Sequence, residues 1–189
     1  MRPIAFLLTI VLAIPAAADH IGIYTDPSAL SCVGSPIYCC LPAWVYIIHE
    51  NGAGAQGSKW RVAHDMPLVL LAFNTGQFTF PFPPGDPLAT GRVASYGECR
   101  SAPYVIGELG FYNPGVTLPA GCNHLRVEPH QGDAWTGPET TVVVVDCAGG
   151  VQAATGGHYS FASSLGCDDC GSPLAVEATT WGSIKALYR

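Results

Sequence analysis

The hydrophobic pattern is clearest at residues 140–147, where four consecutive valines follow two threonines. Branching at Cβ restricts χ1 and disfavours a helix, so this segment predicts a β-strand. Apolar and polar positions do not alternate along it, which is typical of a strand covered on both faces. Gly137 and Pro138 precede the run and Gly149–Gly150 follows it, which bounds the strand. We therefore predict a central strand of a sandwich or barrel.

Shorter segments rich in aromatic and β-branched residues recur along the rest of the chain. They predict strands at 21–25, 43–50, 58–64, 66–73, 92–99, 104–112, 122–128 and 158–161. Asn51–Gly52 is a turn pair, and it favours a hairpin between the second and third of these strands. The phenylalanine-rich segment 77–82 contains a proline and precedes two more, so we expect an edge strand or an extended loop there.

These strands predict an all-β fold, namely an antiparallel β-sandwich of immunoglobulin-like or jelly-roll type with disulfide-bridged loops. Trp181, Ile184 and Tyr188 lie at helical spacing, so a short C-terminal helix is expected. This helix either packs on its own sandwich or forms a tail that docks on a partner or an export machine. The expected organisation is a β-sandwich domain at 19–172 and a C-terminal tail with the short amphipathic helix at 173–189.

Residues 1–18 have the pattern of a secretory signal peptide. A positively charged start is followed by an apolar run at 4–14 and by the small residues Ala16–Ala18. The run is too short for a transmembrane span, and no later segment is long and apolar enough for one. We expect cleavage after Ala18 and a secreted chain that is extracellular or at the cell surface, with the periplasm as an alternative.

Composition narrows the choice of partner. Charged residues make up 12% of the chain and the formal net charge is −6, which becomes −7 when Arg2 leaves with the signal segment. The basic residues are few and scattered, which argues against nucleic acid as a partner.

All eight cysteines follow the signal segment, and an even number in a secreted chain predicts disulfide bonds. The sequence does not choose among the possible pairings. Neighbouring cysteines strain the backbone when they bond to each other, so the adjacent pair is expected to have two different partners. The predicted structural disulfides involve Cys32, Cys39, Cys40, Cys99, Cys122, Cys147, Cys167 and Cys170.

The Cys-x-x-Cys motif formed by Cys167 and Cys170 also allows two functional interpretations. Disulfide exchange requires a thiol of lowered pKa, whereas the two aspartates between these cysteines raise it. A zinc site would need His158 or His124 to complete the ligand set, and the chain has no second motif of this kind. We therefore favour structural disulfides.

The sequence predicts no catalytic residue, cofactor-binding residue or metal ligand. The histidines are scattered along the chain. His64–Asp65 could supply two members of a Ser-His-Asp triad, but no Gly-x-Ser-x-Gly elbow presents a nucleophile. Trp135, in a polar loop, is the predicted contact for a ligand.

Several short motifs occur in order along the chain: Gly22–Asp26, Tyr96–Cys99, Val145–Cys147, Thr155–Gly157 and Thr180–Arg189. In this respect the chain resembles a group of uncharacterised secreted proteins from environmental bacterial genomes. The resemblance implies secretion, a cysteine framework and a β domain. It implies no activity and transfers no catalytic residue.

The functional expectation is a non-catalytic binding or structural module that is secreted or held at the cell surface. Its partner is expected to be a glycan, a peptide or another copy of itself, with a possible export or surface partner for the tail. The alternative is a secreted hydrolase whose site is built on the loops.

Overall fold

The computed structural model describes residues 19–34, 40–50, 52, 54–75, 86–115, 123–131 and 141–161. All regular elements in this part of the chain are β-strands, which confirms the all-β prediction. No helix within these ranges is long and apolar enough to cross a membrane. The predicted signal segment 1–18, the C-terminal helix, the Cys167–Cys170 motif and Trp135 lie outside the described residues.

The described strands fall close to the predicted segments. They are β1 (His20–Tyr24), β2 (Val33–Gly34), β3 (Pro42–Glu50), β4 (Ala55–His64), β5 (Val69–Asn74), β6 (Arg92–Arg100), β7 (Tyr104–Tyr112), β8 (Asn123–Glu128), β9 (Val142–Asp146), β10 (Val151–Gly156) and β11 (His158–Phe161). Sequence analysis did not predict β2 and β10. The first is two residues long, and the second follows a Gly-Gly pair that indicated the end of a strand.

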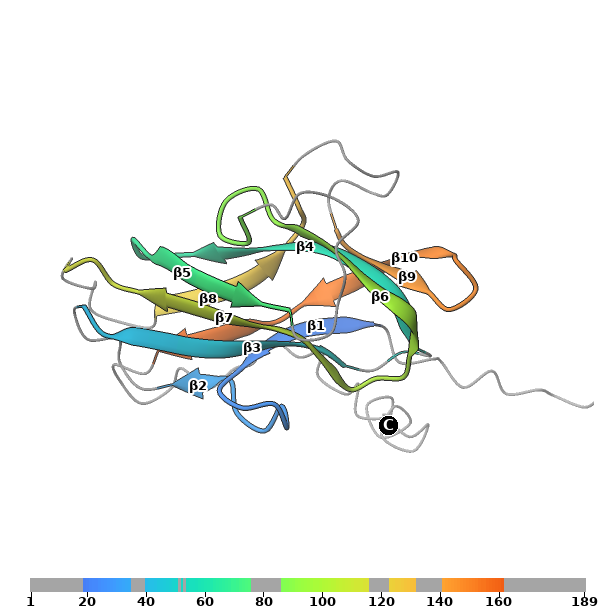
Figure 1. The fold of residues 1–189 in the computed structure, drawn as a ribbon, viewed down its shortest axis with the longest axis horizontal. Helices are drawn as coiled ribbons and strands as arrows, with labels where there is room; N and C mark the ends of the chain where they lie inside the picture. The colour runs from blue at the N-terminus through green and yellow to red at the C-terminus, as the bar shows by residue number, and fades with distance from the viewer. Residues whose placement is uncertain are drawn as a thin grey trace, which may run out of the picture.

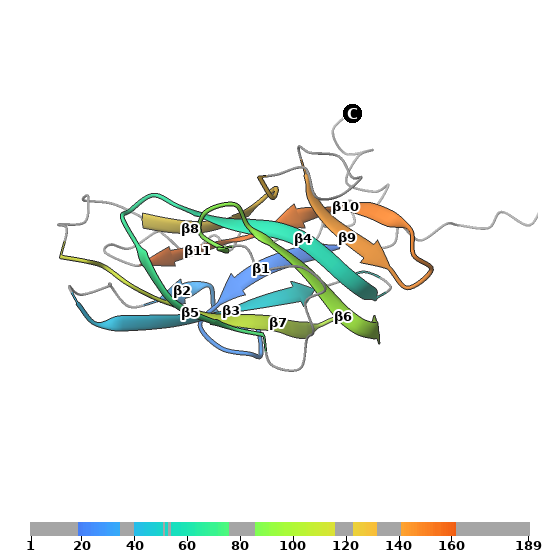
Figure 2. The same cartoon turned by 45° about the horizontal axis from the view of Figure 1, so that its top comes forward.

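The strands form two layers that pack face to face (Figures 1 and 2). The hydrogen-bonded order is β2-β11-β8-β4-β9-β10-β1-β3-β7-β5, and β6 pairs with β4. In Figure 2, β8, β4 and β10 lie in the upper layer, whereas β3, β7 and β5 lie in the lower one. β1 connects the layers, because it pairs with β10 on one side and with β3 on the other.

The sheet is mixed, which corrects the expectation of a purely antiparallel sandwich. β1 pairs with β10 and β2 pairs with β11 in parallel, whereas the other ladders are antiparallel. A parallel pair requires a long crossover connection. Most of the described chain lies between β1 and β10, so this connection is easily long enough.

The predicted hairpin between the segments that became β3 and β4 is wrong. β3 pairs with β1 and β7, whereas β4 pairs with β6, β8 and β9, so the chain passes from one layer to the other after Glu50. Gly52 and Gly54 both have positive φ in this crossing. A Cβ on Gly52 would overlap a carboxylate oxygen of Asp19, so this connection is packed against the start of β1 rather than closed as a tight turn.

The valine run forms β9, between β4 and β10, as predicted for a central strand. Val142, Val143 and Val144 are all buried, and because neighbouring side chains point to opposite faces, both faces of β9 are covered. The large aromatic side chain at the centre of β4, Trp60, is fully buried and packs edge-on against Phe73 of β5. The core therefore lies between the two layers.

A disulfide bond joins Cys99 at the end of β6 to Cys147 in the turn after β9, with the two Cα atoms 5.1 Å apart. Cys32 and Cys40 are also disulfide-bonded, and none of the described cysteines is free. These findings confirm that the chain uses disulfide bonds. The predicted disulfide cysteines Cys39, Cys122, Cys167 and Cys170 lie outside the described residues.

Candidate binding face and buried polar chain

The outer face of the β3-β7-β5 sheet, which we call the front face, exposes large apolar side chains. Ala43 and Val45 of β3 point into the core, so the alternation of a strand turns Pro42 and Trp44 outward. Trp44 is 41% exposed. Its indole lies over Gly110 of the neighbouring β7, where an added Cβ would come within 2.5 Å of the ring.

Further exposed aliphatic residues lie on or beside β3 and β5. Leu71, at a register irregularity in β5, is 49% exposed, and Val69 on the same strand is 39% exposed. Leu41, next to the start of β3, is 59% exposed. Four of the six exposed large hydrophobic residues in the described ranges therefore lie on or beside β3 and β5.

The charged residues of β3, β5 and β7 are both acidic. Glu108 lies on β7, where Asn74 of β5 donates an amide hydrogen bond to its carboxylate over 3.4 Å. Glu50 lies at the end of β3 and accepts a hydrogen bond of 2.6 Å from the hydroxyl of Tyr24. The front face thus combines an apolar centre with negative charge.

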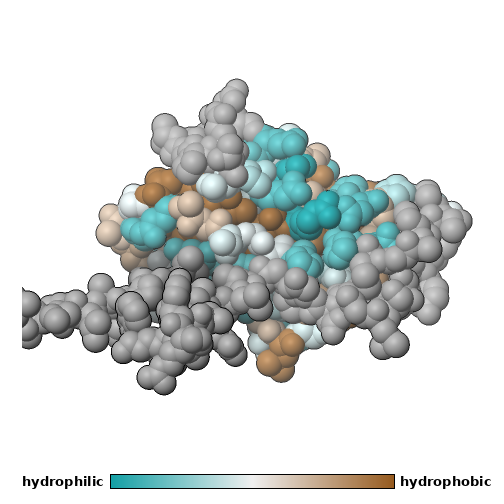
Figure 3. All heavy atoms as spheres, turned by 180° about the vertical axis from the view of Figure 1, so that it is seen from behind, coloured by the Kyte–Doolittle hydropathy of each residue, from teal (hydrophilic) through white to brown (hydrophobic). Residues whose placement is uncertain are grey.

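The opposite layer has a different character. Seen from behind in Figure 3, hydrophilic residues gather over part of the molecule. Arg126 of β8 forms two hydrogen bonds with Asp65, of 2.5 and 3.0 Å, and Arg61 of β4 forms one of 2.5 Å with Glu128. Burial raises the pKa of Asp65, but the bonded Arg126 guanidinium outweighs this effect and holds it below its usual range. These charges neutralise one another, so this surface presents little net charge to a partner.

His64 and Asp65, which could supply two members of a triad, do not contact each other through the hydrogen bonds of their side chains. The imidazole of His64 bonds to the main-chain oxygen of Met66, while Asp65 contacts Arg126 and, over 3.3 Å, His124. The histidine alternatives for zinc, His124 and His158, stack edge to face with ring centroids 5.4 Å apart. No group of three or more potential metal-ligating side chains is present within the described ranges.

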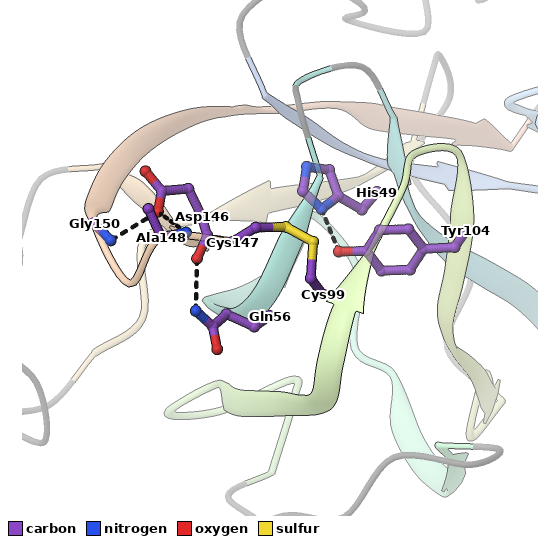
Figure 4. Close-up of a disulfide and its surroundings, with 8 residues drawn as sticks. All are labelled: His49, Gln56, Cys99, Tyr104, Asp146, Cys147, Ala148 and Gly150. Atoms are coloured by element: carbon purple, nitrogen blue, oxygen red, sulfur yellow. Dashed lines mark hydrogen bonds between the residues drawn. A yellow bond between two sulfur atoms is a disulfide. The ribbon is translucent and has the colours of Figure 1, made fainter.

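A chain of polar side chains crosses the core instead. Asp19 accepts a hydrogen bond of 2.9 Å from Nε2 of His49, whose Nδ1 lies 2.6 Å from the hydroxyl of Tyr104. A carboxylate only accepts, so in the neutral imidazole the proton is on Nε2 and Tyr104 donates to Nδ1. Figure 4 shows His49 and Tyr104 together with the Cys99–Cys147 bond.

Asp19, His49 and Tyr104 follow the hydrogen-bond order of a hydrolase triad, with a phenol in the place of the nucleophile. However, His49 is fully buried, and burial raises the pKa of the Tyr104 hydroxyl well above its usual range. A nucleophile must be deprotonated at an accessible position. The arrangement is therefore a structural network and provides no support for the hydrolase alternative.

The network also includes residues of the opposite layer. The ring of Tyr96 on β6 lies 5.0 Å from that of Tyr104, and its hydroxyl donates to Ser58 over 2.6 Å. The indole of Trp60 donates to the same Ser58 oxygen over 3.0 Å. Buried polar groups in this network thus have hydrogen-bond partners from both layers, which fixes how the layers face each other.

Sequence analysis did not identify the front face. Trp135, the predicted ligand contact, lies outside the described residues, whereas Trp44 and Leu71 were assigned to strands without a face. The alternation in 42–47 of Trp44 and Tyr46 with smaller or aliphatic residues was the available signal. It could not show which face was open, because that depends on which layer covers the strand.

No family model matches the sequence, and comparison with curated proteins finds no match either. Among solved structures, the chain is similar to a cohesin module from the family 33 glycoside hydrolase of Clostridium perfringens ATCC13124. The TM-score is 0.52 at 10% sequence identity, over 77% of this chain and 96% of that module. A chain of a CaDoc0917–CaCohA2 complex aligns with a TM-score of 0.43 at 15% identity, over 76% of this chain and 99% of the other. The first comparison shows that this protein has a cohesin-like β-sandwich fold.

Proposed function

We propose that the chain is a secreted, non-catalytic binding module whose front face docks a protein segment with apolar side chains at its centre and basic groups at its rim. The observation that carries the proposal is the gathering of Leu41, Trp44, Val69 and Leu71 on and beside one sheet. A contiguous exposed apolar patch on a soluble protein is typical of an interaction site.

The chemistry of the patch favours a protein over a glycan. A sugar presents hydroxyl groups that need hydrogen-bond partners, and the aliphatic side chains of the front face provide none. Tryptophan at the centre of an apolar patch is typical of a protein interface hot spot. The carboxylates of Glu50 and Glu108, together with the negative net charge, favour basic groups on the partner.

Two further features support a module outside the cell. The expected signal segment and the disulfide bonds both suit an oxidising compartment. The cohesin module with the similar fold is one module of a glycoside hydrolase. In that protein the fold is therefore an attached module of the enzyme chain. The buried Asp19–His49–Tyr104 network gives no site that a substrate could reach.

The test is a selection of peptides from a random display library on the immobilised chain, followed by calorimetric titration of the selected peptides. We expect peptides with apolar centres and Lys or Arg at the flanks. Trp44→Asp and Leu71→Asp should each weaken binding by about 30-fold or more, the loss of a hot spot. The matched control is Val151→Asp, because Val151 is 46% exposed on β10, away from the front face.

The outcomes separate the alternatives. Peptide binding that is insensitive to Trp44→Asp, or a selection that yields no peptide, contradicts the proposal. A glycan array provides the second arm, and glycan binding that Trp44→Asp abolishes would assign the face to a sugar. Sedimentation of the chain alone identifies self-association, which Leu71→Asp would then disrupt. Circular dichroism confirms that each variant is folded.

A further inference from the structure

Two buried histidines lie on neighbouring strands where β1 joins the layers. His20 of β1 and His49 of β3 are both fully buried, although 29 positions separate them in the sequence. The antiparallel pairing of β1 with β3 places His20 opposite Glu50 and Ile21 opposite His49, so the two imidazoles leave the sheet on opposite faces. The histidines are scattered in the sequence, and the fold places these two on adjacent strands.

The hydrogen bonds of His20 assign its proton. Thr155 of β10 donates its hydroxyl to the main-chain oxygen of Asp19 over 3.4 Å, so it accepts from Nδ1–H of His20 over 2.9 Å. The other ring nitrogen, Nε2, therefore carries a lone pair. This nitrogen is buried and has no hydrogen-bond partner among the described residues. A proton on Nε2 would place an unsatisfied donor and a positive charge in a dry site.

No carboxylate among the described residues forms a hydrogen bond with Nε2 of His20, although Glu50 lies opposite it on β3. On β3, His49 is occupied by Asp19 and Tyr104, and the carboxylate of Glu50 accepts from Tyr24. β10 offers Thr155 and has no titratable side chain. β8 and β11 also pack against β1. Their titratable residues are His124, Arg126, Glu128, His158 and Tyr159.

Burial is the dominant influence on both rings. Burial, and to a smaller extent the charge of His49, lower the pKa of His20 from 6.5 to about 4. Burial also lowers the pKa of His49, although its hydrogen bond to Asp19 and the charge of that carboxylate act in the opposite direction. Released from the core, His20 would take up a proton near its ordinary pKa.

β1 is the strand on which this proton would act. The amides of Thr155 in β10 and of Gly157, which follows β10, donate over 2.9 Å to the carbonyls of Asp19 and Ile21. This is a short parallel ladder, and it joins the two layers. Loss of the His20–Thr155 contact would therefore weaken the connection between the layers first.

We propose that His20, bonded to Thr155, forms an acid-sensitive latch, and that proton uptake by His20 releases β1 from β10. The inference does not depend on the proposed partner. Stability is fully retained above pH 6.5, where both states are neutral, and falls as the pH decreases towards 4, because only the released state binds the proton. Between pH 7.5 and pH 5 the opening equilibrium should increase about 30-fold.

Amide hydrogen exchange of the disulfide-intact chain tests the latch. After correction for intrinsic rates, the amides of Thr155 and Gly157 should open about 30-fold more often at pH 5 than at pH 7.5. Amides in the β7–β5 ladder should change much less. In His20→Gln, whose side chain can still donate to Thr155, this acid dependence should disappear. The control is His158→Gln on β11, which should keep it.

Three results would overturn the proposal. The first is an acid dependence of exchange at Thr155 and Gly157 that His20→Gln leaves unchanged. The second is a loss of this dependence in His158→Gln as large as that in His20→Gln. The third is an acid-induced increase in exchange that is equal in both layers. If His20→Gln does not fold, NMR titration of the wild-type histidine rings replaces it. Proton uptake by folded His20 near pH 6.5, rather than below pH 5, would equally contradict the latch.

Discussion

The Cys99–Cys147 bond gives a prediction whose size can be worked out from the structure. The two cysteines are 48 positions apart, and both lie exposed at the ends of strands that flank β4. Their replacement by alanine therefore removes little buried surface. In the chain-entropy model, a bridge over a loop of this length restricts the unfolded chain by about 4 kcal/mol. Other bridges that shorten the effective loop reduce the value towards about 3 kcal/mol.

The perturbation is the double variant Cys99→Ala, Cys147→Ala, which leaves no free thiol from this pair. We expect the free energy of unfolding to decrease by about 3–4 kcal/mol, measured by urea denaturation under non-reducing conditions. Because the effect arises in the unfolded chain, the urea m-value should rise as that chain expands. Far-UV circular dichroism of the folded variant should not change.

The outcome that refutes this reasoning is a decrease of less than about 1 kcal/mol with an unchanged m-value. Such a result would show that the bridge does not restrict the unfolded chain. A suitable control is Ala148→Ser, next to Cys147 and also exposed, which should leave both quantities unchanged.

Two further substitutions examine the connection between the layers. Ser58→Ala removes the shared acceptor of Trp60 and Tyr96, and since each buried unsatisfied donor costs about 1–3 kcal/mol, stability should fall by at least about 2 kcal/mol in urea denaturation. Gly54→Ala should reduce the melting temperature, because Gly54 has φ +102° and an added Cβ would lie 2.7 Å from the carbonyl oxygen of Arg100. Strain at such a φ alone costs about 1–3 kcal/mol, and the backbone contact adds to it.

Each of these variants has a matched control in the chain. Ser160→Ala removes a buried hydroxyl that has no hydrogen-bond partner among the described residues, so it should cost much less than Ser58→Ala. Gly97→Ala introduces a methyl group at φ +73° with no atom within 4 Å, so it measures the backbone strain alone. Equal losses within either pair would contradict the corresponding argument.

Local pattern was sufficient to locate most strands. The valine run was predicted as a strand covered on both faces and is β9, buried between β4 and β10. Residues 104–112 were predicted with the bounds of β7. Both predictions are confirmed because strand propensity and burial are determined largely by the types and the order of consecutive residues.

Pairing was less predictable than strand position. The hairpin expected after Glu50 does not form, because the turn signal Asn51–Gly52 is local while the choice of layer depends on the whole topology. The parallel pairing of β1 with β10 joins segments that lie far apart in the sequence, and no local pattern encodes it. The front face was missed for the same reason, since the exposure of Trp44 depends on what covers β3.

The sequence alone therefore determined the β character of the chain, the buried status of the valine strand and the use of cysteines for bridges. These properties follow from side-chain shape, hydrophobicity and redox chemistry, which act residue by residue. Only the tertiary structure decided which strands become neighbours. This choice placed His20 against Thr155, joined Cys99 to Cys147 and left Trp44 exposed, because contacts between distant segments exist only after both layers have closed over the core.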